Sequence, residues 1–134
     1  MPFMEWDDAL NLGEPTLDRQ HRGLVDLINQ VSEAIESPDR DTEIMHSLTS
    51  MYLYARQHFF DEEAFMERAG YPRREQHAAQ HKLFIEKAQH FTDACLDDSM
   101  HDTDLLEFLV SWIQEHVRHE DARIMRFVNG KDPG

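Results

Sequence analysis

Residues 41–69 have the sequence DTEIMHSLTSMYLYARQHFFDEEAFMERA, and this segment indicates the fold class. Apolar side chains recur along it every three or four residues, which is the spacing of one face of an α-helix. Gly70 and Pro72 follow directly and are typical of a helix end. The sequence therefore predicts a long amphipathic helix whose inward face consists of Ile44, Leu48, Met51, Ala55, His58, Glu62, Phe65 and Ala69.

Three further segments show the same spacing and are separated by turn residues; they cover about 18–36, 73–96 and 102–128. Asp102 or Thr103 is a suitable N-cap for the last of them. Four such helices joined by short loops predict an all-α, up-down-up-down antiparallel four-helix bundle. Residues 1–17 are expected to form an extended N-terminal arm, and the whole chain, 1–134, a single domain.

Composition narrows the class of protein. Thirteen basic residues against 27 acidic ones give a formal net charge of −14, which disfavours contact with phosphate backbones and anionic membrane surfaces. No apolar run approaches the ~20 residues that span a bilayer, and the N-terminus lacks the pattern of a signal peptide. The lone Cys95 cannot form an internal disulfide. We therefore expect a cytoplasmic protein that binds neither nucleic acid nor membranes.

Histidine interrupts the apolar face of every predicted helix. A buried imidazole or carboxylate costs several kcal/mol unless it is paired, and a metal would satisfy both kinds of group together. Any one of these residues could instead be an ordinary hydrogen-bonded core residue or a chance HxxxE or HxxxH pair. Their occurrence on four inward faces favours a shared metal site formed by His21, by His58 with Glu62, by His77 with His81, and by His116.

The donor set indicates which metal to expect, because imidazole and carboxylate without cysteine favour iron or manganese over structural zinc. Spacing does not decide which carboxylate of the fourth helix is the metal ligand. Glu120 lies at i+4 from His116, whereas Asp121 lies at i+5, about 140° around an ideal helix. Asp121 nevertheless belongs to a second apolar stripe with Ile113 and Val117, so periodicity alone does not choose between them.

The chain resembles the hemerythrins, in particular their single-domain bacterial members, along nearly its whole length. The motifs are Trp6-Asp7-Asp8, Leu12-Gly13, Asp18-Arg19-Gln20-His21-Arg22, His58-Phe59-Phe60-Asp61-Glu62-Glu63, His77-Ala78-Ala79-Gln80-His81 and residues 112–121. The resemblance implies two non-haem iron ions joined by an oxo or hydroxo group. It assigns His77, His81 and His116 to one iron, His21 and His58 to the other, and Glu62 and Asp121 to both. The second iron then has an open position for dioxygen.

Choosing Asp121 over Glu120 has a structural consequence, since an i+5 residue shares a face with His116 only where the helix widens. We therefore expect a π-bulge in this turn, with the Glu120 side chain directed to solvent.

The resemblance implies reversible dioxygen binding for oxygen storage, transport or delivery, with no catalytic residue. Leu24, Trp112, Ile113 and Val117 lie near the expected ligands and are predicted to line an oxygen pocket, although ordinary core packing explains them equally well. Two alternatives stay open: a di-iron enzyme that reduces nitric oxide or peroxide, and an oxygen- or redox-sensing interaction module. The corresponding protein partners would be an oxygen-consuming enzyme or a signalling protein, and we expect a monomer or weak oligomer. The remaining histidines, expected on solvated faces, are His46, His90, His101 and His119.

Overall fold

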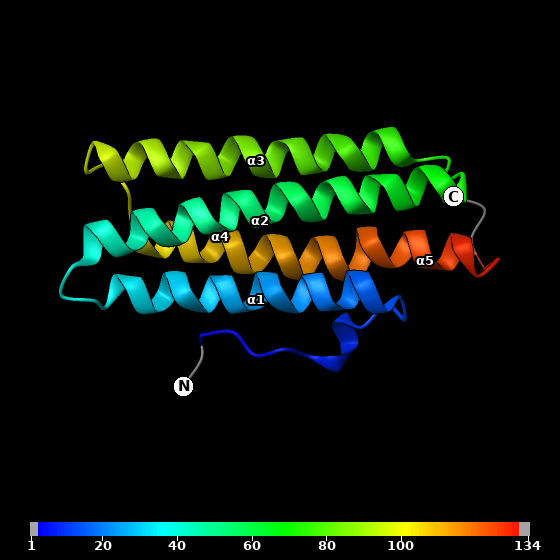
Figure 1. Ribbon diagram of the computed structural model, residues 1–134, viewed down its shortest axis with the longest axis horizontal. Helices are drawn as coiled ribbons and strands as arrows, with labels where there is room; N and C mark the ends of the chain where they lie inside the picture. The colour runs from blue at the N-terminus through cyan, green and yellow to red at the C-terminus, as the bar shows by residue number, and fades with distance from the viewer. Residues whose placement is uncertain (1–2, 132–134) are drawn as a thin grey trace.

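The computed structural model describes residues 3–131 and shows four long helical rods that lie side by side with alternating direction (Figure 1). The all-α, up-down-up-down bundle predicted from sequence is confirmed. Residues 1, 2 and 132–134, at the ends of the predicted single domain, lie outside the described residues. The elements are α1 (Pro15–Ile35), α2 (Arg40–Ala69), α3 (Arg74–Leu96) and a fourth rod composed of α4 (Asp102–Glu115), the π-helical segment η2 (His116–Asp121) and α5 (Ala122–Val128).

One predicted helix start and one predicted N-cap were wrong, whereas the expected start of the fourth helix near residue 102 is confirmed. Helix α1 begins at Pro15 rather than at residue 18, because the Glu14 carboxylate caps it by accepting a hydrogen bond from the backbone N–H of Leu17 at 2.7 Å. A proline in the first turn sacrifices no helical hydrogen bond. Helix α4 is preceded by His101, whose side chain makes no capping bond, so neither Asp102 nor Thr103 is the N-cap.

The predicted end of α2 is confirmed, and it sets the antiparallel order of α2 and α3. Gly70 has a φ of 69°, a left-handed conformation that glycine adopts without strain. Its N–H donates to the carbonyl of Glu67 at 3.1 Å, and the N–H of Tyr71 donates to the carbonyl of Met66 at 3.0 Å. This pattern satisfies carbonyls that a helix end leaves free, and it turns the chain back alongside α2.

The N-terminal arm is docked rather than loosely extended. It contains a short 3₁₀ turn, η1 (Asp8–Leu10), and ends at Glu14 instead of residue 17. The backbone of Met4 exchanges two hydrogen bonds with the Asn29 side chain, at 2.7 and 2.8 Å. Arg118 lies 2.8 Å from the Asp7 carboxylate and so ties the arm to η2.

The core has two apolar parts separated by a polar layer. The larger cluster includes Ile28 on α1, Leu48 on α2 and Leu109 on α4, and the smaller one consists of Met66, Tyr71 and Ile124. The buried histidines and carboxylates occupy the helical turns between these clusters. Among residues 3–131, none of the helices combines the length and the apolar character needed to cross a membrane.

Candidate metal centre

Seven buried polar side chains from all four rods converge in this layer. Helical spacing puts the members of each i,i+4 pair on one face: His58 and Glu62 on α2, and His77 and His81 on α3. None of the seven is more than 4% exposed. The complete set brought together is the one expected from the sequence: His21, His58, Glu62, His77, His81, His116 and Asp121.

The last carboxylate is placed by the π-helical segment η2. The N–H of Ala122 bonds to the carbonyl of Val117, five residues earlier, so this turn holds one residue more than an α-helical turn. Asp121 is consequently 0% exposed and faces the interior, as the resemblance required. We expected the Glu120 side chain to be directed to solvent, but the structure exposes it only in part. It is half-buried and lines a surface groove together with Glu115 and His119.

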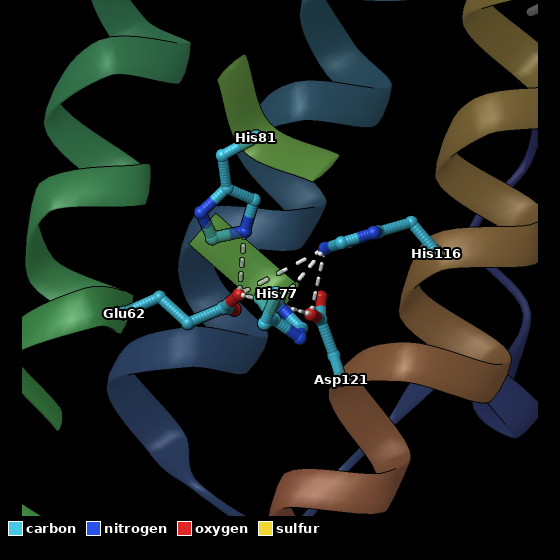
Figure 2. A group of neighbouring side chains, drawn as sticks. All are labelled: Glu62, His77, His81, His116 and Asp121. Carbon is cyan, nitrogen blue, oxygen red and sulfur yellow. Dashed lines mark hydrogen bonds and ion pairs between the residues drawn. The ribbon is translucent and has the colours of Figure 1, made fainter. Parts of the chain in front are cut away.

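Three imidazoles and two carboxylates form the first donor group (Figure 2). Glu62 Oε1 lies 2.7 Å from His77 Nε2 and 3.0 Å from His81 Nε2. Asp121 Oδ1 lies 2.9 Å from His77 Nε2 and 3.0 Å from His116 Nε2. Figure 2 shows the side chains pointing toward one common centre between α2, α3 and the fourth rod.

The second donor group uses the other oxygen of each carboxylate. Glu62 Oε2 lies 3.6 Å from His21 Nε2 and 3.5 Å from His58 Nε2, and Asp121 Oδ2 lies 3.0 Å from His21 Nε2. In both groups, the donor atoms lie within 4.8 Å of one another. The two groups could therefore hold two neighbouring cations, with both carboxylates belonging to both groups.

The electrostatics of this layer indicate a need for positive charge. Burial lowers the pKa of His21 and of His77, but the adjacent Asp121 and Glu62 carboxylates outweigh it and raise these values to about 9 and about 10. Burial alone prevails at His58, whose pKa falls to about 4. Burial acts to raise the pKa values of both carboxyl groups, yet the surrounding imidazoles hold them well below their usual range. Burial also lowers the pKa of His116, but Asp121 and Glu62 outweigh it and raise the value. The raised imidazole pKa values favour a positively charged layer around the two carboxylates.

Several buried polar atoms in the layer lack a hydrogen-bond partner among the described residues: both ring nitrogens of His21, Glu62 Oε2, His77 Nδ1 and both oxygens of Asp121. Some imidazole–carboxylate pairs are close enough to attract each other but are poorly aligned for a hydrogen bond, as His21 Nε2 and Asp121 Oδ2 are at 3.0 Å. Unpaired buried groups of this kind cost free energy, and cations at the two shared positions would satisfy those that point inward. The donor set contains no thiolate, because Cys95 is not a member of either group. These residues therefore fit a pair of iron or manganese ions.

The outer nitrogens of two histidines have partners that sequence reasoning did not assign. His58 Nδ1 lies 2.7 Å from Gln20 Oε1, and His81 Nδ1 lies 3.0 Å from Glu63 Oε2. Both partners belong to the quoted motifs and adjoin an inward-facing residue in sequence, which was the available signal. Periodicity passed over them because they lie on the flanks of their helices rather than on the inward face.

The four residues expected to line an oxygen pocket do not all share one cavity. Leu24, Trp112 and Ile113 line a small apolar cavity inside the bundle, with Met51 and Phe84 among its other walls. Val117 is buried in the main apolar cluster and does not line this cavity.

Aromatic rings also cover two of the clustered imidazoles. Trp112 stacks on the ring of His116 with centroids 4.3 Å apart, and Phe59 stacks on His81 with centroids 4.0 Å apart. These contacts shield the three-histidine side of the centre from water.

The remaining histidines all have exposed side chains and belong to neither donor group, as expected: His46, His90, His101 and His119.

Comparison with known proteins identifies the family. The family model of the hemerythrin HHE cation-binding domain matches residues 12–128. The chain belongs to the hemerythrin family. It is 30% identical over 121 residues to the bacteriohemerythrin of Clostridium acetobutylicum, covering 87% of this chain and 94% of that one. It is 30% identical over 122 residues to the bacteriohemerythrin of Pseudomonas aeruginosa, covering 91% and 79% respectively. A crystal structure of wild-type hemerythrin superposes with a TM-score of 0.81 at 22% identity, covering 90% of this chain and 93% of the other, which supports the fold.

Proposed function

We propose that this hemerythrin-family chain binds dioxygen reversibly at a non-haem di-iron centre, for oxygen storage, transport or delivery. The observation that carries the proposal is the sharing of carboxylates. Glu62 and Asp121 each present one oxygen to a three-histidine group and the other oxygen to a two-histidine group. Carboxylates that connect two donor groups in this way suit a pair of cations held side by side.

The two halves of the proposed centre have different numbers of protein ligands. His77, His81 and His116 would hold one ion, whereas His21 and His58 would hold the other. The ion held by two histidines would have one imidazole fewer and so could accept an external ligand, the arrangement that distinguishes functional from purely structural metal sites. When bound, the iron pair would supply electrons to dioxygen and recover them on release.

The chain's own residues would preserve reversibility by excluding water. The cavity lined by Leu24, Trp112 and Ile113 is apolar, and we propose it as the oxygen pocket. Val117 would contribute through core packing. An apolar surrounding limits the access of solvent and protons to a metal centre and so slows irreversible oxidation. We further propose a single domain in the cytoplasm, monomeric or weakly oligomeric, that passes dioxygen to an oxygen-consuming enzyme.

Iron analysis combined with optical spectra under air and then argon tests this function. We expect two iron ions per chain, one for each donor group. A visible band should appear under air and disappear under argon over repeated cycles. One zinc per chain and no iron after growth in iron-replete medium would contradict the proposal. Sustained dioxygen consumption with added reductant would instead favour a di-iron enzyme.

A matched pair of histidine variants links the spectrum to the site. His58→Ala removes a donor of the two-histidine group and should abolish the oxygenated band. His46→Ala removes an exposed histidine elsewhere on α2 and should leave the band unchanged. Retention of the band in His58→Ala would remove this residue from the proposed site.

A further inference from the structure

A chain of side-chain contacts links α1 to α2 behind His58. Gln20 Oε1 lies 2.7 Å from His58 Nδ1, and Gln20 Nε2 donates to Asp61 Oδ2 at 2.7 Å. Asp61 also accepts a hydrogen bond from Gln57 Nε2 at 3.0 Å. The Tyr54 hydroxyl donates to the backbone carbonyl of Gln20 at 3.0 Å, which holds this part of α1 against α2.

Asp61 determines which atoms donate and which accept in this series of hydrogen bonds. An ionised carboxylate only accepts hydrogen bonds, so Gln20 must turn its amide NH₂ toward Asp61 and its amide oxygen toward His58. The amide oxygen is also only an acceptor, and His58 Nδ1 must therefore carry the hydrogen. The free lone pair is then on Nε2, which faces the interior 3.5 Å from Glu62 Oε2. The contacts select the tautomer that a metal ligand requires before any metal binds.

On the three-histidine side, the group that contacts the outer nitrogen of a histidine is charged rather than neutral. His81 Nδ1 donates to the Glu63 carboxylate at 3.0 Å, so this imidazole has an anionic partner. His58 has a neutral amide in the same role. Among the described residues, the Nδ1 atoms of His21 and His77 have no hydrogen-bond partner. Outer partners fix the orientation of a ligating imidazole, and an anionic acceptor increases its donor strength.

We propose that Gln20 is a positioning residue for the two-histidine metal: it fixes the ring and tautomer of His58 and, because it is neutral, limits the donor strength of that imidazole. A weaker donor favours the reduced ion relative to the oxidised ion. The reduced state is the one in which a reversible carrier binds dioxygen. This inference rests on the proposed function for its redox consequence. The assignment of the tautomer rests on the contacts alone.

The first experiment uses the metal-free protein and a divalent metal other than iron, under anaerobic conditions. Nitrogen-15 NMR should show His58 as the Nδ1–H tautomer in the unmodified chain and a mixture of tautomers in Gln20→Ala. Loss of such a partner usually lowers metal affinity about 10–100-fold. At an unchanged association rate, cobalt(II) should therefore leave the two-histidine site of Gln20→Ala faster by the same factor of about 10–100. Gln30→Ala, which removes an exposed glutamine elsewhere on α1, is the control and should change neither reading. Unchanged tautomer and cobalt release in Gln20→Ala would overturn the proposal.

The second experiment moves a negative charge without changing the net charge. The double variant Gln20→Glu with Asp61→Asn puts a carboxylate directly against His58 and an amide behind it, the reverse of the native order. We expect the centre to favour ferric over ferrous iron by about tenfold more, a fall in midpoint potential of about 59 mV. A purely structural role for Gln20 would leave this potential unchanged and would overturn the redox part of the inference. If the unmodified chain binds no iron, the proposed function fails, whereas the NMR and cobalt measurements still decide the role of Gln20.

Discussion

Removal of the Asp121 carboxylate tests how the fourth rod contributes to the centre. This side chain is 0% exposed, and its oxygens lie 3.0, 2.9 and 3.0 Å from the inner nitrogens of His21, His77 and His116. In Asp121→Ala, these imidazoles keep one buried carboxylate, Glu62, instead of two. Removing one partner of a buried ion pair typically costs about 3–5 kcal/mol, and we expect that loss in the free energy of unfolding of the metal-free protein at pH 7.

Glu120→Ala is the matched control, one residue earlier in the chain. Glu120 is half-buried beside a surface groove and belongs to neither donor group. Its removal should change the free energy of unfolding by no more than about 0.5 kcal/mol. Urea unfolding measures both variants. With a slope of about 2 kcal/mol per molar urea, the predicted loss in Asp121→Ala lowers the midpoint by roughly 2 M.

Metal loading provides the second measurement on the same pair. Asp121 offers an oxygen to each donor group, so Asp121→Ala should lose affinity for both ions, whereas Glu120→Ala should bind two. Equal stability of the two variants, or a centre retained in Asp121→Ala and lost in Glu120→Ala, would refute the assignment of the bridging carboxylate to the π-helical segment.

Four further outcomes are expected. Because carboxylates outweigh burial and hold the pKa values of His21 and His77 at about 9 and about 10, cobalt(II) binding should release protons and weaken as the pH falls from 9 to 7. For the same reason, the metal-free protein should lose stability as the pH rises from 6.5 through 9 and 10. Titration calorimetry in buffers of different ionisation enthalpy and urea unfolding check these two signs. Gly23→Ala should destabilise the protein by about 1–3 kcal/mol, since the added carbon would overlap the hydroxyl and the ring of Tyr54; a smaller cost of the same change in a Tyr54→Ala background checks that cause. Trp112→Ala removes a ring stacked on a clustered imidazole, so it should leave iron content intact and speed autoxidation under air; an unchanged rate would make Trp112 an ordinary core residue.

The number, order and inward faces of the helices followed from the sequence. A repeat near 3.6 residues reports both the helical conformation and the direction in which each side chain points. It therefore identified His58 with Glu62, and His77 with His81, as pairs on inward faces. It also marked Gly70 as a helix end, because few other residues adopt a left-handed φ without strain.

Tertiary structure decided what periodicity cannot express. The choice of Asp121 over Glu120 depends on an added residue in one helical turn, which places the Asp121 carboxylate against His21 and His77 on other helices. The partnership of Gln20 with His58 likewise depends on how closely α1 and α2 approach. Spacing along one helix carries no information about distances between helices. Those distances are set by the packing of the whole bundle, and they determine which donors share a cation site.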